Sequence, residues 1–486
     1  MKYVLSLFAV LLVSCGGPIY ESDTSLDQLP LIPRPQSVIS ELGGFGYGSN
    51  LEVITDNQEL ADLQAFIPVE SSLENSSGPL VLSLGLKHPS PEAYRLSINR
   101  REIRIQGASP AGVFRGIQTL RQILAASNSA PQQPIKVLPL GVIEDWPSVS
   151  YRGTMLDVAR HFFTVDEVKR YIDQMAQYKI NTLHLHLSDD QGWRIEIKAY
   201  PRLTGIGAAT EVGGGSGGFY TQEDFLELQA YAAQRFIQII PEIDMPGHTN
   251  AAIVAYPELN GNGKTVSPYT GTAVGFSTFD ARNEAVYTFV NQVVKELSSL
   301  STSPYFHLGG DESHVTSKED YLYFVERVGQ IIRTHQKTPI GWDEVAQTDL
   351  GPGSVAQFWA SEKNALAAVD KKMKVLMSPA KKAYLDMQYD SLSPYGLHWA
   401  GYISVQDAYN WDPLSYVPGL DADQILGIEA PLWSETISDS SGLEYLAFPR
   451  LICVAELGWT PQSLRSWEDF NRRLTEVSYP GNKSSK

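Results

Sequence analysis

The sequence predicts a two-domain α/β protein, in which a (β/α)8 barrel follows a small α+β domain. The chain has 486 residues, which are too many for one ordinary hydrophobic core. From about residue 148, short apolar segments alternate with amphipathic helical segments, a pattern typical of a parallel sheet. Eight such apolar segments lie between residues 148 and 478. Eight strand-and-helix units are what a closed barrel of this type requires.

The predicted barrel strands are short, apolar and bounded by turn residues. They are residues 153–158, 182–187, 237–243, 305–308, 339–342, 354–359, 374–377 and 425–428. Helical spacing of apolar residues predicts helices over 165–178, 221–234, 283–300 and 317–334. Some later connections are too short, or too rich in Pro and aromatic residues, for a full helix. A doubly wound open sheet is the alternative, but no Gly-rich phosphate fingerprint follows the first strand.

Residues 31–147 predict the small domain, an antiparallel sheet with one helix. Strand-like alternation occurs in residues 51–54, 80–83, 94–98 and 102–105. Residues 111–124 place apolar side chains at helical spacing. No cluster of catalytic residue types occurs in this part of the chain, so we expect the chemistry in the barrel.

The N-terminus predicts an exported lipoprotein. Residues 1–15 have a positive start and an apolar run too short to span a bilayer, which indicates a signal segment. Its end resembles a bacterial lipobox, with Cys15 as the lipidated residue and residues 16–30 as a tether. No Asp follows Cys15, so we expect the outer membrane, facing the periplasm or the cell surface. A plain secretory signal is the alternative. Residues 479–486 are expected to form a short tail.

The formal net charge of −17 restricts the classes of binding partner that we expect. An acidic surface disfavours nucleic acid and anionic lipid, so we expect membrane contact only through the lipid anchor. We expect the protein to use no cofactor and no metal. The other cysteine, Cys453, lies in an apolar segment and is expected to be buried as a small hydrophobe.

Charged and large aromatic residues follow almost every predicted strand. Barrel enzymes place their chemistry at these strand ends, where buried charges and half-exposed aromatics need a reason. Aromatic faces stack on sugar rings, and carboxylates and Arg bond to hydroxyls, so the composition favours a sugar ligand. Each Trp could instead be ordinary core. The residues are Arg160, Asp189, His248, Asp311, Glu312, Trp342, Trp359, Tyr384, Asp386, Trp399, Trp433 and Glu435.

The adjacent acids Asp311 and Glu312 follow two glycines, which indicates close packing at a tight strand exit. Neighbours on an extended strand point in opposite directions. We therefore expect that the two carboxylates do not flank one glycosidic bond as acid and nucleophile. One would act as acid, and the other would position a group that the substrate brings. An acidic pair at a helix start is the alternative.

The chain resembles the family-20 glycoside hydrolases, the β-N-acetylhexosaminidases, over essentially its whole mature length. The run HLGGDE at 307–312 is the sharpest part of the resemblance. The other matching stretches are residues 31–36, 156–162, 184–194, 241–248, 433–435 and 448–450. No departure from the family pattern occurs at the candidate site residues.

The resemblance implies hydrolysis of terminal N-acetylhexosamine residues from oligosaccharides by substrate-assisted catalysis. In this scheme the substrate's acetamido oxygen attacks the anomeric carbon, Glu312 is the acid and then the base, and Asp311 and Tyr384 orient the acetamido group. The resemblance also implies that Trp342, Trp359 and Trp433 form the walls of the acetamido pocket. Its remaining implications are a hydroxyl clamp of Arg160, Glu435, Asp386 and Trp399, and a relay of Asp189 and His248 behind the acid.

Three alternatives stay open at this point. His184 and His186 lie on one face of a predicted strand and could begin a metal site completed by His248 and Asp311. The chain could also be a non-catalytic sugar-binding lipoprotein. Within the family, relatives that release a disaccharide or prefer sulfated sugars remain possible specificities.

Overall fold

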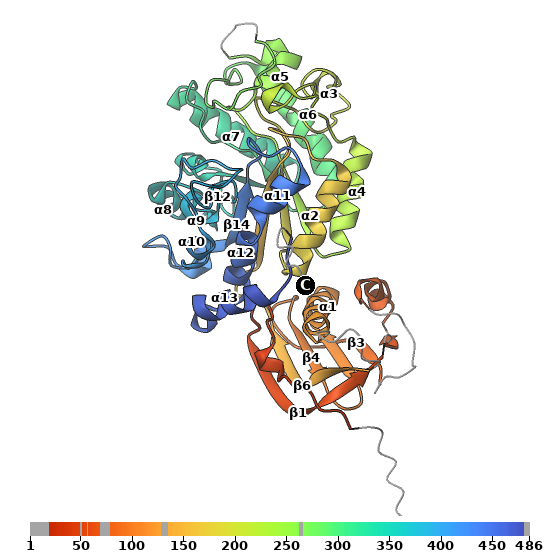
Figure 1. The fold of residues 1–486 in the computed structure, drawn as a ribbon. Coiled ribbons are helices and arrows are strands. Elements are labelled where there is room, and N and C mark those ends of the chain that lie inside the picture. The colour runs from red at the N-terminus through yellow and green to blue at the C-terminus, as the bar shows by residue number, and fades with distance from the viewer. Residues whose placement is uncertain are drawn as a thin grey trace, which may run out of the picture. The chain divides into compact units, whose positions relative to one another are not determined.

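The computed structural model describes residues 19–48, 51–55, 57–68, 78–127, 135–261 and 266–480. The predicted signal segment with Cys15, and residues 481–486 of the predicted tail, lie outside these described residues. The chain divides into two units (Figure 1). The described residues between 19 and 29, 37 and 87, and 94 and 145 belong to the first unit, and those between 30 and 36, 88 and 93, and 146 and 480 belong to the second.

The first unit is a six-stranded sheet with one long helix packed against it. The sheet order is β1-β6-β4-β5-β3-β2. Helix α1 (Pro110–Ala126) begins with Ser109 as N-cap, followed by a proline in the first turn, and contacts β4 and β5 through its apolar face. The strands are β1 (Ser37–Tyr47), β2 (Val53–Thr55), β3 (Leu80–Leu84), β4 (Tyr94–Ile98), β5 (Ile103–Gly107) and β6 (Lys136–Asp145).

The sheet is mixed, so the predicted antiparallel arrangement holds for three of its five strand pairings and is wrong for the other two. β2 pairs with β3 and β3 with β5 in parallel, whereas the three pairings among β1, β6, β4 and β5 are antiparallel. The physical reason lies in the connections. The chain from β2 to β3 crosses over through a 3-10 helix, η2 (Gln58–Phe66), and such a crossover returns the next strand in the same direction.

The predicted tether is partly folded. Tyr20 forms a bridge with Gly44, and a short 3-10 helix, η1 (Leu26–Gln28), packs on β1 and β6. Leu26 and Leu29 are buried. Apolar side chains in this segment bury against the sheet, so residues 20–29 belong to the first unit and do not form a free linker.

The second unit is the predicted closed barrel, and all eight predicted strands are present. The strands are parallel in the order β10-β11-β12-β13-β14-β7-β8-β9. Among them, β7 and β8 pair in register from Gly153 with Thr182 to Asp157 with His186. The bounds are β7 (Tyr151–Asp157), β8 (Thr182–His186), β9 (Gln238–Glu242), β10 (Tyr305–His307), β11 (Thr338–Trp342), β12 (Val355–Phe358), β13 (Lys374–Met377) and β14 (Ile425–Leu432).

Helices surround the barrel where the sequence predicted them (Figure 1). As expected, later connections lack a full helix: β11 leads to β12 through the short 3-10 helix η5 (Asp343–Gln347). The regular helices are α2 (Val165–Gln177), α4 (Gln222–Ala233), α6 (Glu284–Leu300), α7 (Lys318–Thr334), α8 (Glu362–Asp370) and α12 (Arg450–Trp459). The shorter or peripheral ones are α3 (Arg202–Gly205), α5 (Asn250–Ala255), α9 (Ala380–Ala383), α10 (Val405–Tyr409), α11 (Ser440–Ala447) and α13 (Trp467–Glu476).

The barrel core is apolar in part and polar in part. Tyr151, Ile240, Ile340, Val355 and Leu376 form one buried hydrophobic cluster. Buried His and Glu side chains extend from β8, β9, β10 and β14 into the same interior. Buried charges are costly unless they are paired, so these His and Glu side chains need partners. Their contacts are described with the site below.

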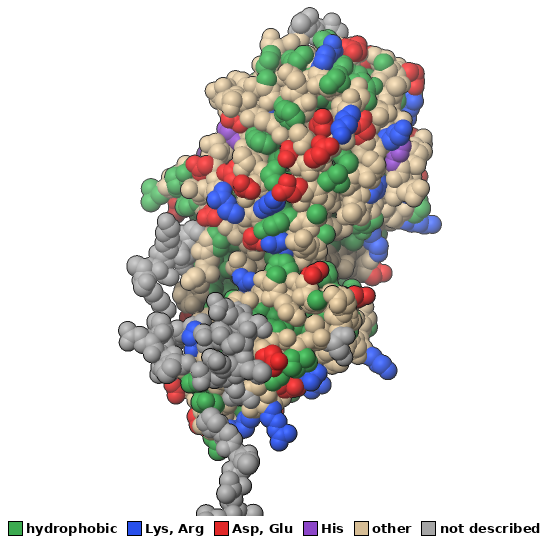
Figure 2. Space-filling model, turned by 90° about the vertical axis from the view of Figure 1, so that its right-hand side faces the viewer, with side chains coloured by type: hydrophobic (Ala, Val, Ile, Leu, Met, Phe, Trp, Pro, Cys, Tyr) green, Lys and Arg blue, Asp and Glu red, His purple; other side chains and the backbone are tan. Residues whose placement is uncertain are grey.

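The surface shows no large field of one sign on the face drawn in Figure 2, where acidic and basic side chains are interspersed over the barrel unit. Cys453 is buried on α12, as predicted. Within the described residues, no helix combines the length and apolar character that crossing a membrane requires.

Candidate active site

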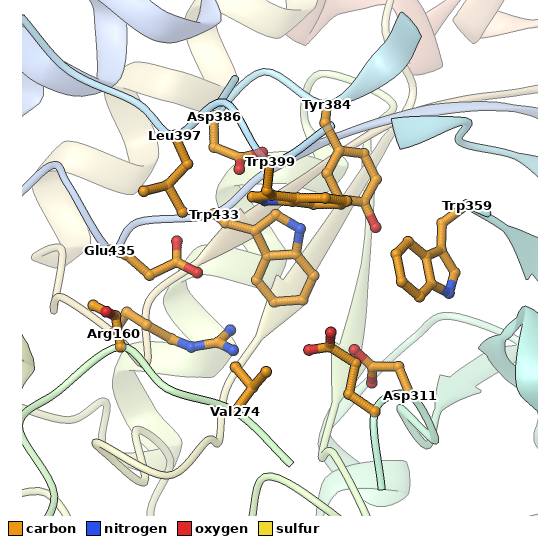
Figure 3. A pocket seen from close by; sticks show the side chains of 12 residues that line it. Arg160, Val274, Asp311, Trp359, Tyr384, Asp386, Leu397, Trp399, Trp433 and Glu435 are labelled. Atoms are coloured by element: carbon orange, nitrogen blue, oxygen red, sulfur yellow. The ribbon is translucent and has the colours of Figure 1, made fainter. Parts of the chain in front are cut away.

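A cavity of about 210 Å³ opens at the C-terminal ends of the barrel strands (Figure 3). Nine of the predicted site residues line it, and they come from segments far apart in the sequence. Thr272, Val274 and Leu397 complete the lining and were not predicted. The nine are Arg160, Asp311, Glu312, Trp359, Tyr384, Asp386, Trp399, Trp433 and Glu435.

The loop after β10 carries Asp311 and Glu312 into this cavity. Gly309, Gly310 and Glu312 have φ angles of 70°, 101° and 44°. A Cβ on Gly309 would lie 1.8 Å from Asp244 Oδ1, so only glycine fits there. The N–H of Gly310 donates to the same oxygen at 3.0 Å. Helix α7 begins only at Lys318, which excludes the helix-start interpretation of the acidic pair.

The positive φ angles show that this segment is not extended, so the prediction that the two carboxylates point to opposite sides is wrong. Oxygens of Asp311 and Glu312 lie within 4.8 Å of one another and of a His248 nitrogen. That nitrogen, Nε2, is 3.9 Å from Asp311 and 3.8 Å from Glu312. The two carboxylates therefore lie close together on one side of the cavity.

Aromatic rings form the opposite side of the cavity (Figure 3). Trp399 lies 6.0 Å from Trp359 and 5.8 Å from Tyr384 between ring centroids, both in edge-to-face geometry. Trp433 is almost fully buried, and Trp342 packs behind it at 5.5 Å. Trp342 is fully buried and is not among the residues that line the cavity, so it supports Trp433 from behind.

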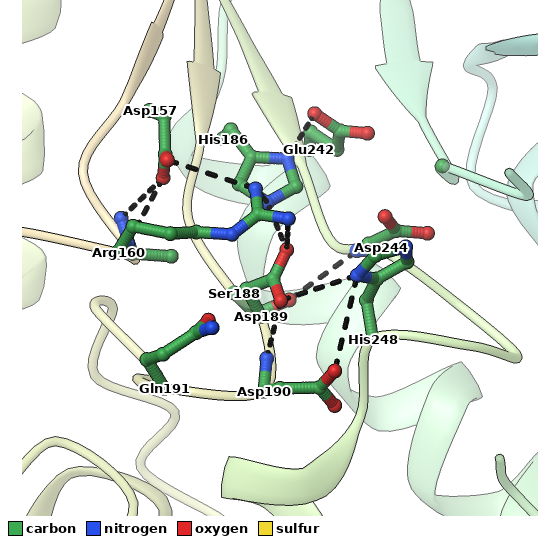
Figure 4. Close-up of polar contacts among 12 residues, drawn as sticks. Asp157, Arg160, His186, Ser188, Asp189, Asp190, Gln191, Glu242, Asp244 and His248 are labelled. Carbon is green, nitrogen blue, oxygen red and sulfur yellow. Dashed lines mark hydrogen bonds and ion pairs between the residues drawn. The ribbon is translucent and has the colours of Figure 1, made fainter. Parts of the chain in front are cut away.

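A buried chain of charged groups lies behind the acids (Figure 4). Arg160 contacts Asp189 Oδ2 at 2.8 Å, and Asp189 Oδ1 is 3.2 Å from His248 Nδ1. Burial alone would raise the pKa of Asp189, but Arg160 and His248 hold it well below its usual range. Burial alone would lower the pKa of His248, but Asp189 and Asp244 raise it well above its usual range. The predicted relay pair is thus in contact and charged.

Several buried polar atoms in or next to the cavity lining have no hydrogen-bond partner within the described residues. They are both carboxylate oxygens of Asp386 and Oδ1 of Asp311 in the lining, and Nε2 of His248 behind it. Burial and the neighbouring Asp244 raise the pKa of Asp311, and burial and Glu435 raise that of Asp386. Burial and Asp311 also raise the pKa of Tyr384. Unpartnered buried polar groups in a cavity indicate a polar ligand.

The catalytic and N-terminal parts of the chain both match one family. Residues 149–321 and 315–462 match the catalytic domain of glycosyl hydrolase family 20, and residues 28–146 match domain 2 of that family. This chain belongs to glycosyl hydrolase family 20. It is a glycoside hydrolase of the β-N-acetylhexosaminidase type.

Relatives of this family-20 chain agree in sequence and in structure. A β-N-acetylhexosaminidase of Cellulomonas fimi is 40% identical over 415 residues, covering 84% of this chain and 83% of that protein. A β-hexosaminidase of Porphyromonas gingivalis is 36% identical, covering 91% of this chain but 62% of that protein. The solved family-20 β-N-acetylhexosaminidase of Streptomyces coelicolor A3(2) has a TM-score of 0.86 at 42% identity, covering 93% of this chain and 96% of that one.

Sequence reasoning missed two glutamates that hold tryptophans of this family-20 site. Glu344 accepts from Trp359 Nε1 at 3.0 Å, and Glu242 accepts from Trp342 Nε1 at 3.0 Å. Burial and the neighbouring Asp343 raise the pKa of Glu344 to about 8. Glu344 lies two residues after the end of β11, so the strand-end rule itself could have found it. Glu242 is the last residue of β9 but lies inside the predicted strand 237–243, and its partners come from other strands.

The two histidines of the metal alternative contact carboxylates directly. His184 Nδ1 is 2.9 Å from Glu429, and His186 Nδ1 is 2.6 Å from Glu242. These are hydrogen-bond distances. Hydrogen-bonded histidines explain the pair without an ion. The non-catalytic alternative is set aside because the chain belongs to a family of hydrolases.

Proposed function

We propose that this chain is an exo-acting β-N-acetylhexosaminidase that removes terminal non-reducing GlcNAc or GalNAc from oligosaccharides, with retention and with the substrate's acetamido group as nucleophile. The observation that carries the proposal is the one-sided acid pair, Asp311 and Glu312, facing an aromatic cavity. Carboxylates that do not flank the sugar leave the opposite face of the anomeric carbon without a protein nucleophile.

The size of the cavity supports exo action. Its volume of about 210 Å³ is below the roughly 300–1,000 Å³ of pockets that hold drug-sized ligands. A single sugar unit suits this space better than a segment of polymer. A solved Streptomyces plicatus relative, 42% identical, is described in complex with the product GlcNAc, which is one such unit.

In the first step, the acetamido carbonyl oxygen bonds to the anomeric carbon while the glycosidic C–O bond breaks, and Glu312 gives its proton to the leaving oxygen. The product is a bicyclic oxazolinium-type intermediate. Asp311 accepts from the acetamido N–H and balances its developing positive charge. The Tyr384 hydroxyl donates to the acetamido oxygen and favours the attacking rotamer. In the second step Glu312 takes a proton from water as the water oxygen bonds to the anomeric carbon, and the bond from that carbon to the acetamido oxygen breaks.

The remaining groups orient the sugar and the acid. Arg160, Glu435, Asp386 and Trp399 would bind the outer hydroxyls and the ring. Asp386 supports this role because neither of its buried oxygens has a protein partner. Asp189 and His248 would form the relay that fixes the position and protonation of Glu312. Trp359 and Trp433, with Trp342 behind, would enclose the acetamido group and exclude water.

The test compares the wild type with Asp311→Asn and Glu312→Gln on aryl GlcNAc, aryl GalNAc and chitobiose. We expect both variants to lose activity, and for Glu312→Gln on chitobiose we expect a fall in kcat of roughly 10²–10⁴-fold, because the poor leaving group needs a proton. Glu319→Gln is the matched control, because Glu319 is exposed on α7. A thiazoline mimic of the bicyclic intermediate should inhibit the wild type. Indifference of the wild type to that mimic would contradict the neighbouring-group mechanism.

We also propose that the protein is exported and lipidated at Cys15. The support is the apolar N-terminal segment that ends at a Cys. Metabolic labelling with a fatty acid should mark the wild type and not Cys15→Ala, and the variant should leave the membrane fraction. Labelling of the Cys15→Ala variant would contradict the proposal.

A further inference from the structure

The carboxylate of Glu242, at the end of β9, joins two parts of the site that the proposed mechanism treats separately. Its side chain is fully buried. Oε1 accepts from the indole Nε1 of Trp342 at 3.0 Å, and Oε2 contacts His186 Nδ1 at 2.6 Å. Each oxygen therefore holds a different group, and the two groups lie on opposite branches of the site.

One branch runs from Glu242 through His186 and Asp189 to His248 (Figure 4). His186 Nε2 is 2.9 Å from Asp189 Oδ2, and Asp189 Oδ1 is 3.2 Å from His248 Nδ1. His248 Nε2 then lies 3.8 Å from Glu312. A continuous series of alternating carboxylates and imidazoles thus runs from Glu242 to the general acid. The relay is longer than the pair Asp189 and His248.

The other branch leads to the aromatic wall. Trp342 is fully buried and stacks behind Trp433, which lines the cavity. The backbone N–H of Trp342 also donates to the carbonyl oxygen of Gly309 at 2.9 Å, in the loop that carries the acid pair. Rotation of the Trp342 indole would therefore disturb the wall, while its backbone supports the acid loop.

Further imidazoles keep Glu242 charged. His184 Nε2 is 2.8 Å from its Oε2, and His307 Nδ1 is 3.0 Å from its Oε1. Burial alone would raise the pKa of Glu242, but His307, His186 and His184 hold it well below its usual range. The acidic groups that feel this charge are Asp244 and Asp311, since Glu242 contributes to the raised pKa of each.

We propose that Glu242 is a positioning residue that couples the acetamido pocket to the acid relay, so that one carboxylate sets both how the sugar's acetamido group is held and how Glu312 is positioned. The inference rests on the proposed function. It adds a residue without contact to the substrate, acting through Trp342 on one side and through His186 on the other.

Two variants separate the effect of the charge of Glu242 from the effect of its side-chain length. Glu242→Gln presents an amide N–H₂ to either Trp342 or His186, so one contact becomes donor against donor. We expect kcat/KM to fall on the order of 10²-fold, as a small misplacement of reacting groups does. We also expect the acidic limb of the pH profile to move to lower pH, because Asp311 must be a carboxylate and losing the negative charge of Glu242 lowers its pKa. Glu242→Asp keeps the charge but shortens the side chain, so the limb should stay while KM rises.

Glu456→Gln is the matched control. Glu456 is equally buried on α12 and accepts from Arg473 at 2.7 Å through both oxygens, away from the cavity. We expect this variant to unfold at lower urea concentration, with the kcat, KM and pH profile of the wild type. If Glu242→Gln behaves in the same way, its role is structural and the inference is overturned.

Trp342→Phe tests the wall branch even if Glu242→Gln fails to fold. It removes the indole N–H without changing any charge, so KM should rise and the pH limb should stay in place. Wild-type KM in Trp342→Phe would overturn the coupling. Failure of the proposed function is recognised separately, because the wild type itself would then ignore the thiazoline mimic.

Discussion

The buried carboxylates of the barrel form two groups whose pKa values are shifted in opposite directions. At the cavity, Asp311 and Asp386 have raised pKa values, chiefly through burial, and Oδ1 of Asp311 and both carboxylate oxygens of Asp386 lack protein partners. Deeper in the barrel, Glu242 and Glu429 have lowered pKa values, because their imidazole partners outweigh the burial that would raise them. Partners, and not burial, decide the direction of the shift.

The difference teaches how to distinguish residues that bind from residues that position. Glu429 accepts from Tyr151, from Gln357 at 2.7 Å and contacts His184 at 2.9 Å, so its hydrogen-bonding capacity is used within the protein. The two carboxylate oxygens of Asp386 accept no hydrogen bond from the described protein and are available to a ligand. A buried carboxylate with free oxygens carries a folding cost that only the substrate relieves, whereas a saturated one fixes its neighbours.

The largest effect on folding is expected in the inner group. Glu429→Gln leaves the His184 imidazolium without one of its two carboxylates and should lower the free energy of unfolding by about 3–5 kcal/mol. Urea unfolding measures this loss, with the exposed Glu319→Gln as control. A stability equal to that of the control would remove the distinction between the two groups.

A substitution in the cavity group should lower activity without lowering the free energy of unfolding. Asp386→Asn should lower kcat/KM by about 10- to 100-fold, because a hydrogen bond to a charged group contributes about 1.5–3 kcal/mol. Since the raised pKa of Asp386 means that its charge destabilises the fold, the free energy of unfolding above pH 7 should be unchanged or higher. Loss of stability comparable to that of Glu429→Gln would contradict the comparison.

The pH dependence of folding sharpens the inner group further. Burial alone would lower the pKa of His184, but Glu242 and Glu429 raise it to about 9 from 6.5. The imidazolium therefore stabilises the fold fully below pH 6.5, and this contribution is lost as pH rises through 9. The difference in unfolding free energy between wild type and His184→Gln should shrink between pH 6 and pH 9.5. A difference that stays constant would show that His184 is neutral.

The smallest effect is expected at the outer wall. Trp359→Phe removes the indole N–H that Glu344 accepts at 3.0 Å and keeps an aromatic face. The lost hydrogen bond contributes about 0.5–1.5 kcal/mol, so KM for aryl GlcNAc should rise only several-fold. Steady-state kinetics checks this, and a loss as large as that of Asp386→Asn would place Trp359 among the essential binding groups.

The sequence predicted the barrel well because each strand and helix is a local pattern. The same local logic missed β1 and β6. β1 has a bulge between Glu41 and Gly44, and β6 contains Pro139 and Gly141, so neither keeps a clean alternation. It also failed at Glu312, whose φ of 44° belongs to a turn that strand reasoning could not foresee.

The strand-end rule found the residues of the cavity but not their positioning partners. His186 and Glu242 meet because β8 and β9 pair in that register, and Glu429 meets His184 because the barrel closes. Such contacts depend on how distant strands align, which no single window of sequence contains. Residues at the cavity can therefore be predicted from their place after a strand in the sequence. The residues that position them can be identified only once the fold is known.

The central claim is that the substrate's own acetamido oxygen is the nucleophile. Its most direct test is the rate on aryl glycosides whose N-acyl group carries none, one, two or three fluorines. Fluorine withdraws electrons from the carbonyl oxygen and weakens it as a nucleophile, so kcat should fall steeply and progressively along the series. Rates that are independent of fluorination would contradict the account and would point to a nucleophile supplied by the protein.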